Sequence, residues 1–226
     1  MVKIIWGLFA AVFAMGGVSA SSFAENWCKS VQAPQIHIKT STDSVSYNFS
    51  LSEKALNGFS IDTVNPYGGN VITDVGGLMK GGIVVSQSMR YGTMTNTRTN
   101  EVCYWYTDID ISLHINPTIY IASEFPHGTC KHNAIMQHEQ QHVMIDRQIV
   151  NKFAPLIGQA VKNEVRRQTT FGPISTSRQA ELEAYLKSNM QTIVNRQTDI
   201  MNAERKQRQQ ALDNLQEYER VNHVCK

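Results

Sequence analysis

Hydrophobic and polar positions follow a period of two in the amino-terminal half of the chain. Apolar and polar residues alternate over 35–39, 45–51 and 59–62, as they do in strands exposed on one face. The alternation returns over 102–122 around Pro117, which suits an edge strand. Paired glycines punctuate residues 66–93 and favour turns or a hairpin. These patterns predict an antiparallel β-rich part over residues 25–125.

The carboxy-terminal half has the period of an α-helix. One helical tract covers residues 131–168 and a second covers 176–222, with a turn at 169–175 that contains Gly172-Pro173. The two tracts should form a long antiparallel helical hairpin. The polar centre of the second tract, 195–210, is typical of a solvated face or of a docking face for a partner protein. The expected fold is therefore a single α+β domain over residues 25–226, in which a β region precedes the hairpin.

The first 24 residues have the pattern of a secretory signal peptide. Lys3 precedes an apolar stretch over 4–18, and small residues follow near positions 20 and 24. We expect a secreted or periplasmic protein with no membrane span after signal cleavage, because no other segment is long and apolar enough. The net charge of +2 argues against nucleic acid as a partner.

Four cysteines remain after the expected cleavage, at positions 28, 103, 130 and 225. An even number in an exported chain predicts two disulfides, and no pair has the C-x-x-C spacing of a structural zinc site. Of the three possible pairings we favour Cys103 with Cys130 and Cys28 with Cys225. The second bridge would join the two ends of the mature chain.

The clearest chemical motif is His138-Glu139-Gln140-Gln141-His142, inside the first helical tract. Two histidines four residues apart on a helix lie on one face, so both imidazoles can bind one Zn²⁺. In this motif the glutamate acts as a general base on a water at the metal. Glu139 is therefore the predicted catalytic residue, with His138 and His142 as metal ligands. The alternative is a pair of structural histidines on an ordinary amphipathic helix.

A catalytic zinc site needs a third protein ligand. If the helices fold back near residue 172, His138 and His142 lie opposite residues 202–206, a window that contains Glu204. Glu204 is the predicted third ligand, and Asp199 could orient a ligand. The rivals that stay open are Glu164, His223 and, less strongly, Asp146.

The chain resembles the zincin metallopeptidases in its His-Glu-x-x-His core. Its strands, its cysteine before the motif helix and its helical hairpin resemble an uncharacterised bacterial family of predicted secreted zinc-dependent proteases. That family's pattern ends with Asp-x-x-Thr-x-His on the later helix, and residues 199–204 have the same spacing, with Asn202 and Glu204 in place of Thr and His. The resemblance implies a minimal zincin-like fold and a gluzincin-like site. The metzincin extension is absent, because Ile145 and Gln148 stand where that pattern has Gly and His.

The predicted function is an exported zinc-dependent metalloprotease that hydrolyses peptide bonds of a peptide or protein substrate. The edge strand expected around residues 111–121 could pair with that substrate, and Tyr120, His114 or His132 could supply an oxyanion donor. Two alternatives stay open. One is a non-proteolytic zinc-binding envelope interaction protein, and the other is a peptidoglycan amide hydrolase.

Overall fold

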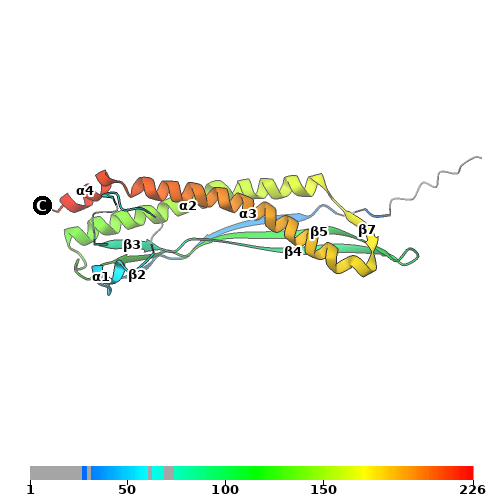
Figure 1. Ribbon diagram of the computed structural model, residues 1–226, viewed down its shortest axis with the longest axis horizontal. Coiled ribbons are helices and arrows are strands. Elements are labelled where there is room, and N and C mark those ends of the chain that lie inside the picture. The colour runs from blue at the N-terminus through cyan, green and yellow to red at the C-terminus, as the bar shows by residue number, and fades with distance from the viewer. Residues whose placement is uncertain (1–26, 30–31, 61–62, 69–73, 226) are drawn as a thin grey trace, which may run out of the picture.

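The protein is a long, narrow α+β molecule, in which two long helices run beside a ribbon of strands (Figure 1). The computed structural model describes residues 27–29, 32–60, 63–68 and 74–225. The expected signal peptide over 1–24 lies outside the described residues. The α+β class and the long carboxy-terminal helix agree with the expectation from the sequence.

Three long strands, each interrupted once, form the ribbon. One sheet has the order β1 (Gln35–Thr42), β5 (Glu101–Ile115), β4 (Ile83–Asn96), and the second has β2 (Ser46–Asn48), β6 (Thr118–Ile121), β3 (Gly77–Lys80). Each strand of the first sheet is next in the chain to the strand at the same position of the second: β1 leads into β2, β5 into β6, and β3 into β4. The breaks fall together at residues 43–45, 81–82 and 116–117. A short strand, β7 (Phe171–Ser175), pairs with the far end of β5.

This pairing corrects two expectations. β1 runs parallel to β5 and β2 runs parallel to β6, so the β region is mixed rather than purely antiparallel. Residues 111–121 were expected to form an edge strand, but β5 and β6 each have neighbours on both sides. Pro117 lies in the break between them, where no ladder hydrogen bond is needed from its nitrogen. The strand expected at 59–62 does not form at Phe59 and Ser60, and residues 61–62 lie outside the described part.

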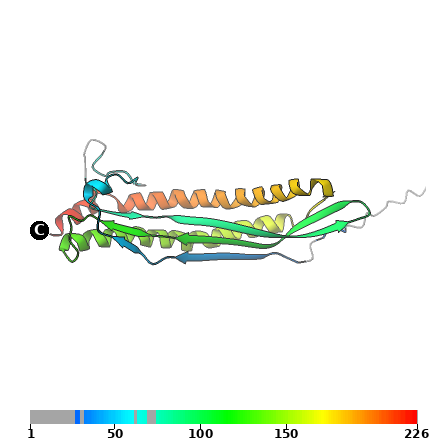
Figure 2. The same cartoon turned by 90° about the horizontal axis from the view of Figure 1, so that it is seen from below.

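The helices lie along the strands (Figure 2). α2 (Cys130–Arg167) continues through Pro155, and its first turn is capped by Thr129, whose side chain accepts from the His132 N–H. The chain then passes through β7 and a 3-10 turn (Thr176–Arg178) into α3 (Gln179–Leu212). A short helix, α4 (Leu215–His223), follows, and α1 (Glu53–Leu56) lies at the same end of the molecule (Figure 1).

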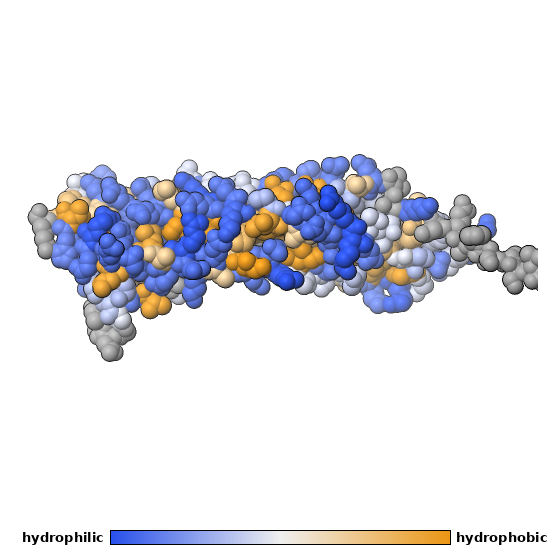
Figure 3. Space-filling model, turned by 90° about the horizontal axis from the view of Figure 1, so that it is seen from above, coloured by the Kyte–Doolittle hydropathy of each residue, from blue (hydrophilic) through white to orange (hydrophobic). Residues whose placement is uncertain are grey.

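The main core fills the space between β5 and the two long helices, through residues such as Ile109, Ile149 and Leu186. A smaller cluster joins β6 to the first half of α2 through Ile119, Ile121, Ile135 and Val143. This second cluster fixes the motif helix against β6 and β3. On the face seen from above, apolar side chains are scattered among polar ones (Figure 3).

The two expected disulfides are present, but both predicted pairings are wrong. Cys28 bonds to Cys103 and Cys130 bonds to Cys225. β1 and β5 are parallel, with Gln35 beside Asp108, so Cys28, which precedes β1, lies at the end of the sheet where β5 begins and contains Cys103. The antiparallel return of α3 and α4 brings Cys225 to the first residue of α2. Both bridges suit a protein that folds in an oxidising compartment. Among the described residues, no helix is long and apolar enough to cross a membrane.

Candidate metal centre

The two motif histidines converge as the helical spacing requires. Their rings lie 4.9 Å apart between centroids and are nearly perpendicular, and their Nε2 atoms are 3.2 Å apart. Each residue is only 8% exposed. Buried polar groups need partners, and those of His138 and His142 come from the far end of the second helical tract.

Asp213 completes the group from a break in that tract. α3 ends at Leu212, and Asn214 caps the start of α4 by accepting from the Glu217 N–H, so Asp213 lies between two helices. Its Oδ1 is 3.0 Å from Nε2 of His138 and 3.0 Å from Nε2 of His142. Among the residues that the structure describes, this is the one group of three histidine, cysteine or acidic side chains that could hold a metal ion.

Further side chains set the orientation of both imidazoles. The Nδ1 of His138 is 3.2 Å from Oε1 of Glu217, and the Nδ1 of His142 pairs with Oε1 of Gln209. Carboxylate and amide oxygens accept, so each Nδ1 carries a hydrogen. Nε2 is then the nitrogen that faces Asp213: it donates to the carboxylate while it is protonated, and it can bind a metal ion once that proton is lost. This is the usual arrangement around metal-binding histidines.

Gln209 is held in turn by a buried ion pair. Its Nε2 donates to Asp146 Oδ1 at 2.8 Å, and Asp146 also accepts from Arg205 at 2.6 Å. Asp146, proposed from the sequence as a weak ligand candidate, is thus a support for Gln209 rather than a member of the group. The chain Arg205, Asp146, Gln209 extends the orientation of His142 into the helix interface.

The three ligand atoms fit a small metal ion. They form a nearly equilateral triangle with edges of 3.0, 3.0 and 3.2 Å. Tetrahedral zinc with bonds of about 2.0–2.1 Å separates neighbouring ligand atoms by about 3.3 Å. Two nitrogens and one carboxylate oxygen also form a donor set that zinc accepts, so the buried group can hold a metal ion.

The charges of the group favour a cation. Burial alone would raise the pKa of Asp213, but hydrogen bonds from His138 and His142 outweigh burial and hold that pKa well below its usual range. Burial alone would lower the pKa of His142, but the hydrogen bond to Asp213 and the charge of Glu139 raise it to about 9. The site therefore stabilises positive charge between the imidazoles and the carboxylate.

Glu139 lies beside the group and is only 4% exposed. Burial raises the pKa of its carboxyl group, and the two histidines and the Met79 N–H oppose that shift. Met79 belongs to β3. Gly77, two residues earlier, lets the strand approach the helix, because a Cβ there would lie 2.2 Å from Cγ2 of Ile135 and 3.1 Å from Oε1 of Glu139.

Replacing Gly77 with alanine should destabilise the protein and disturb Glu139. The added methyl group overlaps Ile135, and overpacking of this kind costs about 1–3 kcal/mol. Chemical unfolding of the variant measures the loss. Gly82→Ala is the matched control, since a Cβ at Gly82 meets nothing within 4 Å. Equal stability of the two variants would contradict the close packing of β3 on α2.

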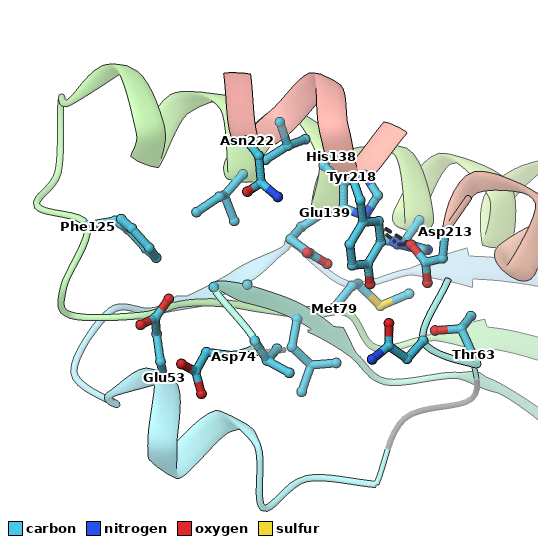
Figure 4. A pocket seen from close by; sticks show the side chains of 18 of the residues that line it. Glu53, Thr63, Asp74, Met79, Phe125, His138, Glu139, Asp213, Tyr218 and Asn222 are labelled. Carbon is cyan, nitrogen blue, oxygen red and sulfur yellow. Dashed lines mark hydrogen bonds and ion pairs between the residues drawn. The ribbon is translucent and has the colours of Figure 1, made fainter. Parts of the chain in front are cut away.

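A cavity of about 230 Å³ opens beside the metal-binding group. His138, Glu139 and Asp213 lie at one side of it, and Glu53 and Asp74 lie across from them (Figure 4). The rest of the lining is mixed, with apolar side chains such as Phe125, Ile135 and Val221 beside polar ones such as Lys131 and Asn222. A substrate in this cavity would meet both the metal position and Glu139.

The predicted third ligand, Glu204, is not in the group. It lies on α3 and its Oε2 binds Nζ of Lys152 at 2.5 Å. The fold-back estimate placed the centre of the hairpin at about residue 172, whereas the pairs 138–213 and 142–209 place it at residue 175 or 176. The added β7 strand and 3-10 turn cause this difference, so Asp213 takes the position that was predicted for Glu204.

The rival ligands also lie elsewhere. Glu164 pairs with Arg167 at 2.7 Å, and His223 bonds within α4 to the Glu219 carbonyl at 2.8 Å. Asp199 is exposed. The structure therefore brings together His138, Glu139 and His142 from the predicted set, but not Asp199 or Glu204, on which the later part of the family resemblance rests.

None of the three predicted oxyanion donors reaches the group. His114 pairs with Asp43 at 3.0 Å, Tyr120 packs on Phe59, and His132 lies in a separate ring cluster. Tyr218 of α4 is in the cavity instead, with its ring 6.1 Å from that of His138. Burial, with Asp213 and Glu139 nearby, raises its pKa, so its hydroxyl keeps its proton.

The sequence contains a signal for the break between α3 and α4, which was not predicted. Asn214 followed three residues later by Glu217 has the spacing of a helix amino-terminal cap. That pattern divides the second tract at residue 213 and would have marked Asp213 as a residue between helices.

Comparison of the chain with protein-family models, with curated proteins and with solved structures finds no match.

Proposed function

We propose that this chain is an exported zinc-dependent metallopeptidase of the His-Glu-x-x-His type. The observation that carries the proposal is the convergence of His138, His142 and Asp213 beside the buried carboxyl group of Glu139, at the wall of an open cavity. A structural zinc site would be closed by four protein ligands, whereas three ligands leave a position for water or substrate.

The roles of the residues follow from this geometry. His138, His142 and Asp213 would hold the ion, which when bound would activate water and polarise a carbonyl group. Glu139 accepts the proton of the attacking water and passes it to the leaving amine. Tyr218, which lines the same cavity, would donate a hydrogen bond to the developing oxyanion. Glu217 and Gln209 keep both imidazoles in the ligating tautomer.

The placement of β3 supports a peptide as the substrate. Among the described strands, β3 pairs with β6 alone, so its other edge has no strand partner. Glu139 lies close to this strand, since a Cβ at Gly77 would be 3.1 Å from its Oε1. An extended peptide that added to β3 would lie across the cavity with a carbonyl group near the metal position. This edge takes the place of the one expected at residues 111–121.

Incubation of the zinc-loaded mature protein with a mixture of unstructured peptides tests the proposal. We expect new peptide termini in mass spectrometry, their loss with a chelator, and their return when zinc is added. Cleavage of purified peptidoglycan fragments without peptide cleavage would favour the amide hydrolase alternative. A folded, zinc-loaded protein that cleaves neither substrate would contradict the hydrolase assignment and favour the interaction protein.

A further inference from the structure

A second histidine pair lies at the start of α2, apart from the proposed catalytic group. The rings of His127 and His132 are 5.1 Å apart between centroids, and Phe49 packs edge-on against His132 at 4.9 Å. His127 is exposed, whereas His132 is 1% exposed. His132 is six residues before His138, about 9 Å along the helix axis. The two pairs are therefore separate sites.

The tautomer of His132 follows from the hydrogen bond that its ring makes. Its Nδ1 lies 3.0 Å from the carbonyl oxygen of Phe125, which can only accept, so Nδ1 carries the hydrogen. In a neutral ring, Nε2 then has a lone pair and needs a donor or a metal. Among the described residues, Nε2 has no hydrogen-bond partner although it is fully buried. Such an unsatisfied buried atom calls for a bound water or ion.

The surroundings of this nitrogen are those of a metal ligand. An imidazole whose Nδ1–H binds a backbone carbonyl is oriented as metal-binding histidines are. The second imidazole, His127, lies at a ring spacing of 5.1 Å, close to the 4.9 Å of the His138 and His142 pair. His127 is exposed, so solvent reaches the second imidazole.

We propose that His127 and His132 bind a divalent transition-metal ion, with solvent completing its coordination. Imidazole ligands suit Zn²⁺, Ni²⁺ and Cu²⁺, and the general affinity order places Cu²⁺ as the tightest of the three. The ion binds at the loop between β6 and α2, independently of the ion at Asp213.

The site would act on the cavity through Phe125. The carbonyl group of Phe125 holds His132, and its side chain lines the cavity beside the proposed catalytic group (Figure 4). An ion shared by His127 and His132 would join this loop to the first turns of α2. It would therefore stabilise the cavity wall without taking part in the chemistry.

Copper binding by the metal-free protein tests the proposal. The measurement is made in a His142→Ala variant, so that the catalytic group does not contribute a complete site. We expect one tightly bound Cu²⁺ per chain, with nitrogen hyperfine structure in its electron paramagnetic resonance spectrum. His127→Ala should weaken that binding by about tenfold or more, because it removes one of two protein ligands. His127 is exposed, so this change spares the core.

His37→Ala is the matched control, since His37 is an exposed histidine on β1 far along the chain from this loop. It should leave the copper affinity unchanged. Equal effects of His127→Ala and His37→Ala, or none from either, would overturn the proposal and leave a buried water as the partner of His132. A failure of the catalytic site is distinguishable, because it would change zinc binding at Asp213 and not this copper signal.

Discussion

Replacing Asp213 with alanine should abolish tight zinc binding, whereas replacing Glu204 with alanine should leave it intact. Asp213 contributes the one carboxylate of the group, 3.0 Å from each of the two Nε2 atoms. Loss of a residue that only orients a ligand weakens metal affinity by about 10–100-fold, and we expect loss of a direct ligand to exceed that range. Equilibrium dialysis against zinc, with elemental analysis of the protein, gives the affinity.

Glu204→Ala is an informative control because Glu204 is the ligand that the sequence favoured. Its carboxylate pairs with Lys152, whose side chain is 53% exposed, and exposed pairs contribute about 0–1 kcal/mol to stability. The Glu204 variant should therefore fold and bind zinc like the parent. Circular dichroism shows whether both variants are folded. Zinc retained by folded Asp213→Ala and lost from Glu204→Ala would reverse the assignment.

Replacing Glu139 with glutamine should leave zinc bound and reduce turnover by about 10²–10⁴-fold. The amide has the size of the carboxyl group, but it cannot take a proton from water. Because Glu139 is buried, the neutral side chain should not lower the stability of the fold. The rate of peptide cleavage, zinc content and midpoint of thermal unfolding are measured together.

Glu53→Gln is the control within the same cavity. Glu53 lines the cavity across from the metal-binding group and does not contact it (Figure 4). We expect this variant to keep most of the turnover, which separates loss of a base from loss of negative charge in the cavity. Normal cleavage by Glu139→Gln would remove Glu139 from the role of base. Loss of zinc from that variant would instead make Glu139 a support of the metal site.

The local parts of the site could be predicted because they depend on residues close in the chain. The His138 and His142 pair with Glu139 between them follows from helical periodicity over five residues. The Asn214 and Glu217 spacing is equally local, and it went unused because the apolar stripe on either side favours one continuous helix. An apolar stripe reports which face is buried but does not report a single capped break.

The pairing of distant segments could not be predicted in the same way. The choice among three cysteine pairings depends on the parallel alignment of β1 with β5, which brings Cys28 to Cys103. The third ligand depends on the offset between α2 and α3, which β7 and the 3-10 turn set. Moving the centre of the hairpin from about residue 172 to 175 or 176 moves the residue opposite each histidine by about twice that amount, or two helical turns. That is enough to replace Glu204 by Asp213.

The sequence by itself determined the α+β class, the helical hairpin, the presence of two disulfides and the His138, Glu139 and His142 set. Only the tertiary structure decided that Asp213, Gln209, Glu217 and Tyr218 meet these residues, and that β3, among the described strands, has an edge without a strand partner near Glu139. The physical reason is the range of the interactions. Periodicity and capping act within one or two helical turns, whereas ligand convergence requires the relative positions of segments some seventy residues apart.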